Sequence, residues 1–183
     1  MAELVQAIRT YEAAYSHWPL ANLATNTDVT CGVEVASIHG FKAMEGVQLI
    51  SANSDLMIIL MDLDMGVNAG HKLNPKRIQF LAAKMTGDTN SPGVSAVDYQ
   101  YRDPWGNPYV ISLDANHDDH VSNALYSNAA LYPKGCPASL TNHAGAFDFI
   151  GNVMVWSLGP DGKASMSAPA SDSPNRDNVR SWE

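Results

Sequence analysis

Oxygen-bearing side chains gather in the last part of the chain, between residues 158 and 178. Asp161 lies in a Gly-Pro-Asp-Gly turn, and the glycines of such a turn let backbone carbonyls converge. Asp172, Asp177 and Asn178 add carboxylate and amide oxygens near the end of the loop. Calcium takes about six to eight oxygens from groups of these kinds. The stretch therefore predicts a calcium site, and an acidic, solvated loop without metal is the alternative.

A second candidate for cation binding is the segment 114–120, Asp-Ala-Asn-His-Asp-Asp-His. Asp114, Asn116 and Asp118 match the first three alternating ligand positions of an EF-hand loop. Position six is Asp119 where that loop needs glycine, and position twelve is Leu125 where it needs a bidentate glutamate. The match to the EF-hand pattern is therefore incomplete.

The histidines of the same segment allow a different metal. His117 and His120 could contribute imidazole nitrogens to a zinc or nickel site. A solvated polar turn without any metal is favoured over both kinds of metal site, because the segment is rich in residues that prefer turns.

Two pairings of cysteine and histidine could supply a nucleophile and a base: Cys31 with His39, and Cys136 with His143. Neither cysteine lies in a glycine-rich nucleophile turn. The chain also has no phosphate-binding glycine loop, no His-Glu-x-x-His and no Gly-x-Ser-x-Gly. The sequence therefore predicts a protein that is not an enzyme. Whether Cys31 and Cys136 form a disulfide, as cysteines of exported proteins often do, is left open.

The composition limits the classes of partner. With 183 residues, 45% of them apolar and 16% charged, the chain is expected to form a single domain with a buried core. The net charge of −8 argues against nucleic acid as a partner, and against a polybasic contact with an anionic membrane. The longest apolar run, Leu56 to Met61, is too short to span a membrane, and no signal peptide is visible.

The elements that position these residues follow from periodicity. Residues 3–17 carry an apolar stripe at helical spacing, and Trp18-Pro19 should end that helix. A second helix is expected to begin at Ser54. Residues 109–113 and 152–157 are rich in β-branched and aromatic side chains, and we expect them to pair as antiparallel strands against the first helix.

Three motifs together resemble a known family. They are Asp-Pro-Trp-Gly-Asn-Pro-Tyr at 103–109, Trp-Ser-Leu-Gly-Pro-Asp-Gly at 156–162, and Asp-Asn-Val-Arg-Ser-Trp at 177–182. In this order, after an amphipathic helix, they resemble the C-terminal half of the major pseudopilin of type II secretion systems. The resemblance covers about residues 1–20 and 74–183.

The resemblance implies a pilin-like α+β fold, in which a long N-terminal α-helix packs on a small antiparallel β-sheet with a C-terminal metal-binding loop. Residues 1–18 would be the remainder of the spine helix, 20–100 a variable region of helix and loop, and 103–183 the sheet and the C-terminal loop. In the Pro-Trp-Gly-Asn-Pro block, Trp105 and Tyr109 would pack on the helix, so Trp105 is expected to be buried.

The resemblance also implies ligands for calcium. In such pseudopilins the Asp of the Gly-x-Asp-Gly turn, a leucine carbonyl and a later acidic residue bind the ion, which here correspond to Asp161, Leu158 and Asp177. Asn178 stands where an acidic residue is often found, which departs from the pattern.

The implied function is that of a structural subunit of a secretion pseudopilus, which supports protein export across the outer membrane. Its partners would be other pseudopilin subunits, as a homopolymer, and components of the secretion system. The complete protein would be periplasmic and anchored in the inner membrane by a methylated, hydrophobic N-terminal helix. Met1 is accordingly expected to lie inside a longer helix, and a complete, soluble chain is the alternative.

Two other functions remain open from the sequence. The chain could be a subunit of another type IV pilus-like filament, used for adhesion, uptake or motility. It could also be a periplasmic metal-dependent hydrolase or binding protein, because its acidic surface and candidate metal ligands suit that class.

Overall fold

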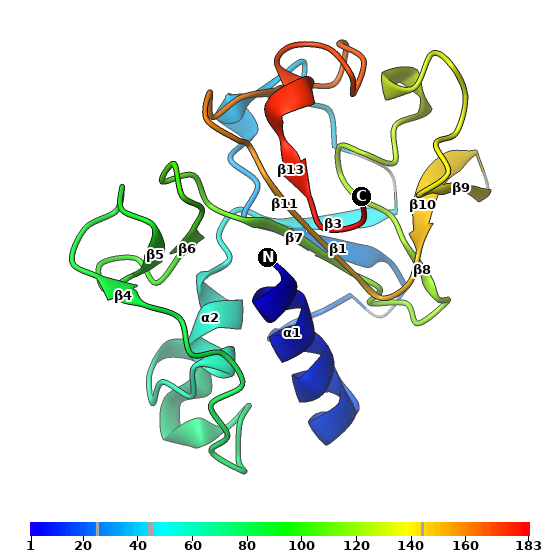
Figure 1. Cartoon of the computed structure of the whole chain (residues 1–183). Helices are drawn as coiled ribbons and strands as arrows, with labels where there is room; N and C mark the ends of the chain where they lie inside the picture. Colours follow the sequence, from blue (N-terminus) through cyan, green and yellow to red (C-terminus); the bar gives the residue numbers. More distant parts are fainter. Residues whose placement is uncertain (25, 44–45, 144) are drawn as a thin grey trace.

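The computed structural model describes residues 1–24, 26–43, 46–143 and 145–183. It contains two α-helices of different length, α1 (Ala2–Tyr15) and α2 (Ser54–Leu60), among many short strands (Figure 1). The strands are β1 (Asp28–Cys31), β2 (Ile38–His39), β3 (Val47–Ile50), β4 (Met85–Thr86), β5 (Gly93–Ser95), β6 (Tyr101–Arg102), β7 (Val110–Leu113), β8 (His120–Val121), β9 (Thr141–His143), β10 (Ala146–Ile150), β11 (Val153–Ser157), β12 (Ala164–Ser165) and β13 (Val179–Arg180). Short 3-10 helices occupy Val35–Ser37, Gly66–His71, Ala129–Leu131 and Asn175–Asp177.

The largest sheet has five strands in the order β13-β11-β7-β1-β3. β1 and β3 are parallel, whereas the other neighbours in this sheet are antiparallel. β7 and β11 pair with Val153 opposite Leu113 and Trp156 opposite Val110. The two strands expected at 109–113 and 152–157, and their antiparallel pairing, are therefore confirmed.

Both faces of this sheet are covered, because alternate residues of its strands enter different cores. On one face Ile111 and Val155 pack in a core with Ile8 and Tyr11 of α1, and α2 contributes to the same core. Figure 1 shows the two helices together on this side of the sheet. On the other face Val110 and Trp156 pack with Leu125 and Tyr126 of the long connection that follows β8.

The fold predicted from the sequence, a long N-terminal helix on a small antiparallel sheet, is wrong. The chain is mostly β, with several small sheets in addition to the five-stranded one, and that sheet is mixed. α1 has 14 residues and ends at Tyr15, and the next residue, Ser16, takes a left-handed conformation with φ 56°. Many of the additional strands have only two or three residues, too few for an alternation of apolar residues to appear in the sequence.

Two further expectations are settled by side-chain positions. Trp105 is 48% exposed, so the prediction that it is buried is wrong. The turn that contains it closes through hydrogen bonds to Asp103, which leaves the indole on the outer side. Cys31 is buried and Cys136 is exposed, and both thiols are free. Among the residues that the structure describes, no helix combines the length and the apolar character needed to cross a membrane.

Candidate functional site

The turn at 103–109 and the turn at 156–162 are joined by side chains. The side-chain amide of Asn107 donates a hydrogen bond of 2.7 Å to the carbonyl oxygen of Gly159. Gly162 lies close to the same amide, since a Cβ built on Gly162 would come within 2.9 Å of Asn107 Oδ1. The two motifs that are distant in sequence therefore form one unit.

Asp103 links the same turns from the interior. Its carboxylate is fully buried and accepts backbone hydrogen bonds from Trp105 at 2.9 Å and Asn107 at 2.8 Å. The hydroxyl of Ser157 donates to the same carboxylate, and this hydroxyl accepts from the backbone N–H of Gly159 at 3.0 Å. Ser157 is thus held between a carboxylate and a backbone amide, an arrangement that fixes turns and provides no imidazole base.

The third motif, at 177–182, reaches the same unit through backbone contact. Gly159 has φ +66°, and a Cβ on it would collide with the carbonyl oxygen of Asp177. Asn178 is buried, and its amide donates to the hydroxyl of Tyr126 at 2.8 Å. The Arg180 guanidinium lies 5.2 Å from the centre of the Tyr126 ring, which adds a cation–π contact.

The structure brings together only some of the predicted calcium ligands. Leu158 is buried next to Gly159, and Gly159 touches Asp177, so the turn and the pair 177–178 are neighbours. Asp161 is exposed, and one of its oxygens accepts the backbone N–H of Lys163 at 2.9 Å. Asp172 is exposed in a separate turn, where its carboxylate accepts from the Ser171 hydroxyl at 3.0 Å.

These donors fit calcium in kind, since all of them are oxygens. Asn178 Oδ1 is buried and has no hydrogen-bond partner among the described residues, as an oxygen held ready for a cation would be. The carboxylates do not form a complete coordination shell. In the described ranges, no group of three or more His, Cys, Asp or Glu is placed to hold a metal ion. The fit therefore rests on Leu158, Asp161, Asp177 and Asn178, and Asp172 stands apart.

The segment 114–120 forms a tight loop between β7 and β8. Both carboxylate oxygens of Asp114 accept backbone hydrogen bonds, from Asp118 at 3.1 Å and from Asp119 at 3.0 Å. The two histidines of the segment contact different residues. The His117 ring stacks on Trp18 with ring centroids 6.0 Å apart, and the His120 ring stacks on His143 with ring centroids 4.2 Å apart. A shared zinc or nickel site on His117 and His120 is not formed.

Among the described residues, no hydrogen bond joins Cys31 to His39 or Cys136 to His143. Burial raises the pKa of the Cys31 thiol to about 12, so the thiolate that would attack a substrate is disfavoured. His143 lies 3.4 Å from the Asp148 carboxylate and stacks on His120. The sulfur of Cys136 contacts the carbonyl oxygen of Pro137, its own neighbour in the chain.

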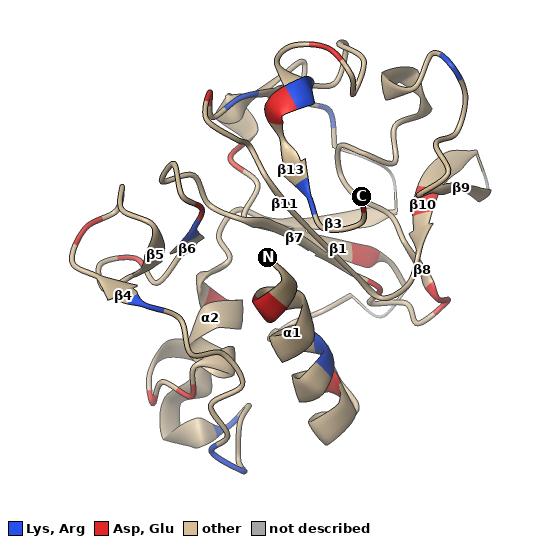
Figure 2. Ribbon diagram, viewed as in Figure 1, with Lys and Arg blue, Asp and Glu red and all other residues tan. Residues whose placement is uncertain are grey.

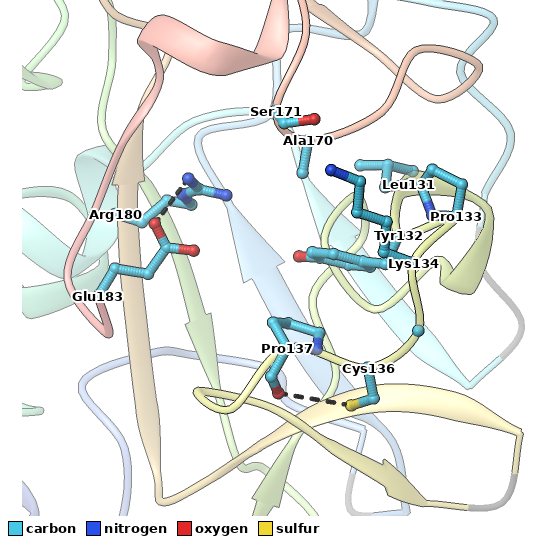
Figure 3. Close-up of a pocket in the computed structure, with 11 residues that line it drawn as sticks. Leu131, Tyr132, Pro133, Lys134, Cys136, Pro137, Ala170, Ser171, Arg180 and Glu183 are labelled. Carbon is cyan, nitrogen blue, oxygen red and sulfur yellow. Dashed lines mark hydrogen bonds and ion pairs between the residues drawn. The ribbon is translucent and has the colours of Figure 1, made fainter.

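A cavity of about 390 Å³ opens beside the C-terminal strand (Figure 3). Its lining is mainly apolar, from Leu131 to Pro137 on one side and Ala170 on the other, and Cys136 lies at its edge. Arg180 and Glu183 form an ion pair of 2.6 Å along its rim. The residues of the turns at 103–109 and 156–162 do not line this cavity, and Lys134 adds a positive charge to its lining.

Sequence reasoning missed two roles in this region. Asp103 bonds Ser157 across 54 residues of chain. Asn107 bonds Gly159. The sole sequence signal for either contact was the presence of both motifs in one chain, since short polar side chains in turns usually bond locally.

Comparisons of the chain with profiles of known protein families, with curated proteins and with solved structures returned no match.

Proposed function

We propose that this chain is a structural subunit of a type II secretion pseudopilus, and that its globular part carries interlocked turns in place of a catalytic centre. The proposal rests on the resemblance of three motifs to the major pseudopilin. It differs from the expected architecture, because the globular part is mostly β and its sheet is covered on both faces.

One observation carries the proposal. The three motifs that resemble the pseudopilin are the segments that meet through Asn107, Gly159 and Asp177. The pairing of β11 with both β7 and β13 brings the three segments to the same end of the sheet. The bonds from Asn107 to Gly159 and from Ser157 to Asp103 hold two of these turns together, which suits a rigid subunit that must pack repeatedly in a filament.

Calcium binding by the C-terminal turn is part of this proposal. The ligands would be the Leu158 carbonyl, Asp161, Asp177 and Asn178. A bound cation would offset the repulsion between the two carboxylates and tie the turn to the last strand.

Filament assembly in cells tests the function. The hydrophobic N-terminal segment of a major pseudopilin would be joined to residue 1, and the fusion expressed with a secretion system that overproduces pseudopili. We expect immunogold label along the filaments in electron micrographs. The same chain without the added segment is the control and should not enter filaments. A fusion that stays dispersed in the inner membrane, while the parent pseudopilin assembles in the same cells, would contradict the proposal.

The same design separates the proposed function from the nearest alternative. In cells that assemble type IV pili as well as pseudopili, label confined to the pili would assign the chain to a filament for adhesion, uptake or motility.

A further inference from the structure

Two buried carboxylates lie at one end of the five-stranded sheet, away from the C-terminal turn. The register of β1 and β7 pairs Val29 with Leu113. Asp28 precedes Val29 and Asp114 follows Leu113, so the two aspartates lie on neighbouring strands at the same end of the sheet. Figure 2 shows acidic segments at the start of β1 and in the connection between β7 and β8. Asp28 is 3% exposed and Asp114 is 2% exposed. Like charges in this position repel each other, and desolvation increases the cost.

Asp28 has an oxygen that nothing in the described chain satisfies. Its Oδ2 accepts the backbone N–H of Ser122 at 2.6 Å, whereas its Oδ1 is buried without a hydrogen-bond partner. A buried carboxylate oxygen of this kind needs either a proton or a cation.

The loop that faces Asp28 turns sharply at Asp119, which has a positive φ. An EF-hand uses glycine at position six because the chain must take a positive φ there. Asp119 stands at that position and has φ +64°, so the sharp turn is made without glycine. Asn116 Oδ1 is a second buried oxygen without a partner among the described residues, and Asn116 Nδ2 donates to Asp118 Oδ2 at 3.0 Å.

The EF-hand pattern lacks its ligand at position twelve in this chain. Leu125 occupies position twelve and is fully buried in the core, so it offers no ligand. We propose that Asp28 takes this part, and that Asp28, Asp114, Asn116 and Asp118 bind one calcium ion. This site is independent of the calcium proposed for the C-terminal turn.

The donor set selects the kind of cation. All four side chains offer oxygen, which favours a hard cation. Asp118 is exposed, and a ligand that can move suits the flexible coordination shell of calcium better than the strict octahedron of magnesium. Asp114 already accepts two backbone N–H groups, but each carboxylate oxygen has a second lone pair. The shell is not preformed. Binding must therefore draw the exposed Asp118 from Asn116 towards Asp28.

A cation bound at this site would lie close to Trp18, which follows α1 in the chain. The indole N–H of Trp18 donates to the carbonyl oxygen of Asp114 at 2.6 Å. Trp18 is therefore a built-in donor for luminescence from terbium bound in place of calcium.

Counting bound calcium by equilibrium dialysis tests the site. We expect Asp28→Asn and Asp118→Asn each to bind one calcium fewer per chain than the unaltered protein. Asn at position 28 keeps an oxygen for the Ser122 N–H, and Asp118 is exposed, so both variants should fold. Asp119→Asn is the matched control: it removes the same charge from the same loop, asparagine tolerates the positive φ, and position six supplies no side-chain ligand.

The results that would overturn the proposal are equally definite. Unchanged stoichiometry in both Asp28→Asn and Asp118→Asn would mean that Asp28 holds a proton and not a cation. A second result would also overturn the proposal. It is an unaltered protein in which tryptophan does not sensitise terbium emission, or in which that emission is the same as in Asp28→Asn.

Discussion

The side-chain amide of Asn107 donates to the carbonyl oxygen of Gly159, 2.7 Å away, and joins two turns that lie 52 residues apart in the chain. Asp103 and Ser157 make a second bond between the same turns. The indole of Trp105, between Asp103 and Asn107, points outward. The block at 103–109 therefore acts through its short polar side chains, and its tryptophan is free to contact something else.

Replacing Asn107 by Ala should lower the free energy of unfolding by about 1–3 kcal/mol, because the Gly159 carbonyl loses its donor. Urea denaturation followed by circular dichroism measures this. Asn90→Ala, at an exposed position in the loop beside Gly106, is the control and should stay within about 0.5 kcal/mol of the unaltered protein. Equal stability of the two variants would argue against the interlock.

Gly159 and Gly40 offer a matched test of the contact with Asp177. Both have positive φ, +66° and +70°, so alanine carries a similar backbone penalty at each, about 1–2 kcal/mol. A Cβ at Gly40 meets nothing within 4 Å, whereas a Cβ at Gly159 collides with the Asp177 carbonyl. Gly159→Ala should therefore cost at least about 1 kcal/mol more than Gly40→Ala. A smaller difference in denaturation midpoints, at equal slopes, would show that the two segments are not held together.

The tryptophans of the two motifs should respond differently to truncation. Trp156 is fully buried between Tyr126 and the sheet, and its replacement by Ala should cost about 3–5 kcal/mol. Trp105→Ala should cost less than about 1 kcal/mol, because the side chain is 48% exposed. Thermal melts of the two variants check this. A strongly destabilised Trp105→Ala protein would contradict the placement of that indole.

The parts of the fold that could be predicted were those with strong periodicity. The stripe of Leu4, Ile8 and Tyr11 located α1, and the apolar strands β7 and β11 were located with their pairing. Strands of two or three residues such as β8 and β9 were missed because they are too short for alternation to appear. Their longer counterparts β1, β3 and β10 have four or five residues, and their pairing depends on distant segments. The predicted fold class was wrong for the same reason, since most of the strands in the sheets were not predicted.

The candidate site stays a prediction. Turn chemistry and oxygen content predicted ligands between residues 158 and 178, and Asp172 lies in a turn of its own. Asp28 could not be found, because its meeting with Asp114 depends on the register of β1 and β7, which no local pattern encodes.

Calcium should stabilise the protein through the C-terminal turn. At a hundredfold excess over its Kd, a bound ion adds about 2.7 kcal/mol to the free energy of unfolding. We expect Tm to rise with calcium and fall with chelator, with magnesium a poor substitute. Asp161→Asn should remove part of the difference, and adding Asp28→Asn should remove the rest. Identical melting of Asp161→Asn and the unaltered protein at every calcium concentration would remove Asp161 from the ligands.

The central claim, that this chain is the globular part of a pseudopilus subunit, is tested most directly by the N-terminal sequence of the protein purified from its own cells. Mass spectrometry of the mature polypeptide should find about twenty apolar residues, enough to span a bilayer, in one continuous helical pattern with Leu4, Ile8 and Tyr11. A methylated first residue and a glutamate near it would mark processing by a prepilin peptidase. A mature protein that begins at Met1, or one in which a polar domain precedes it, would contradict the account.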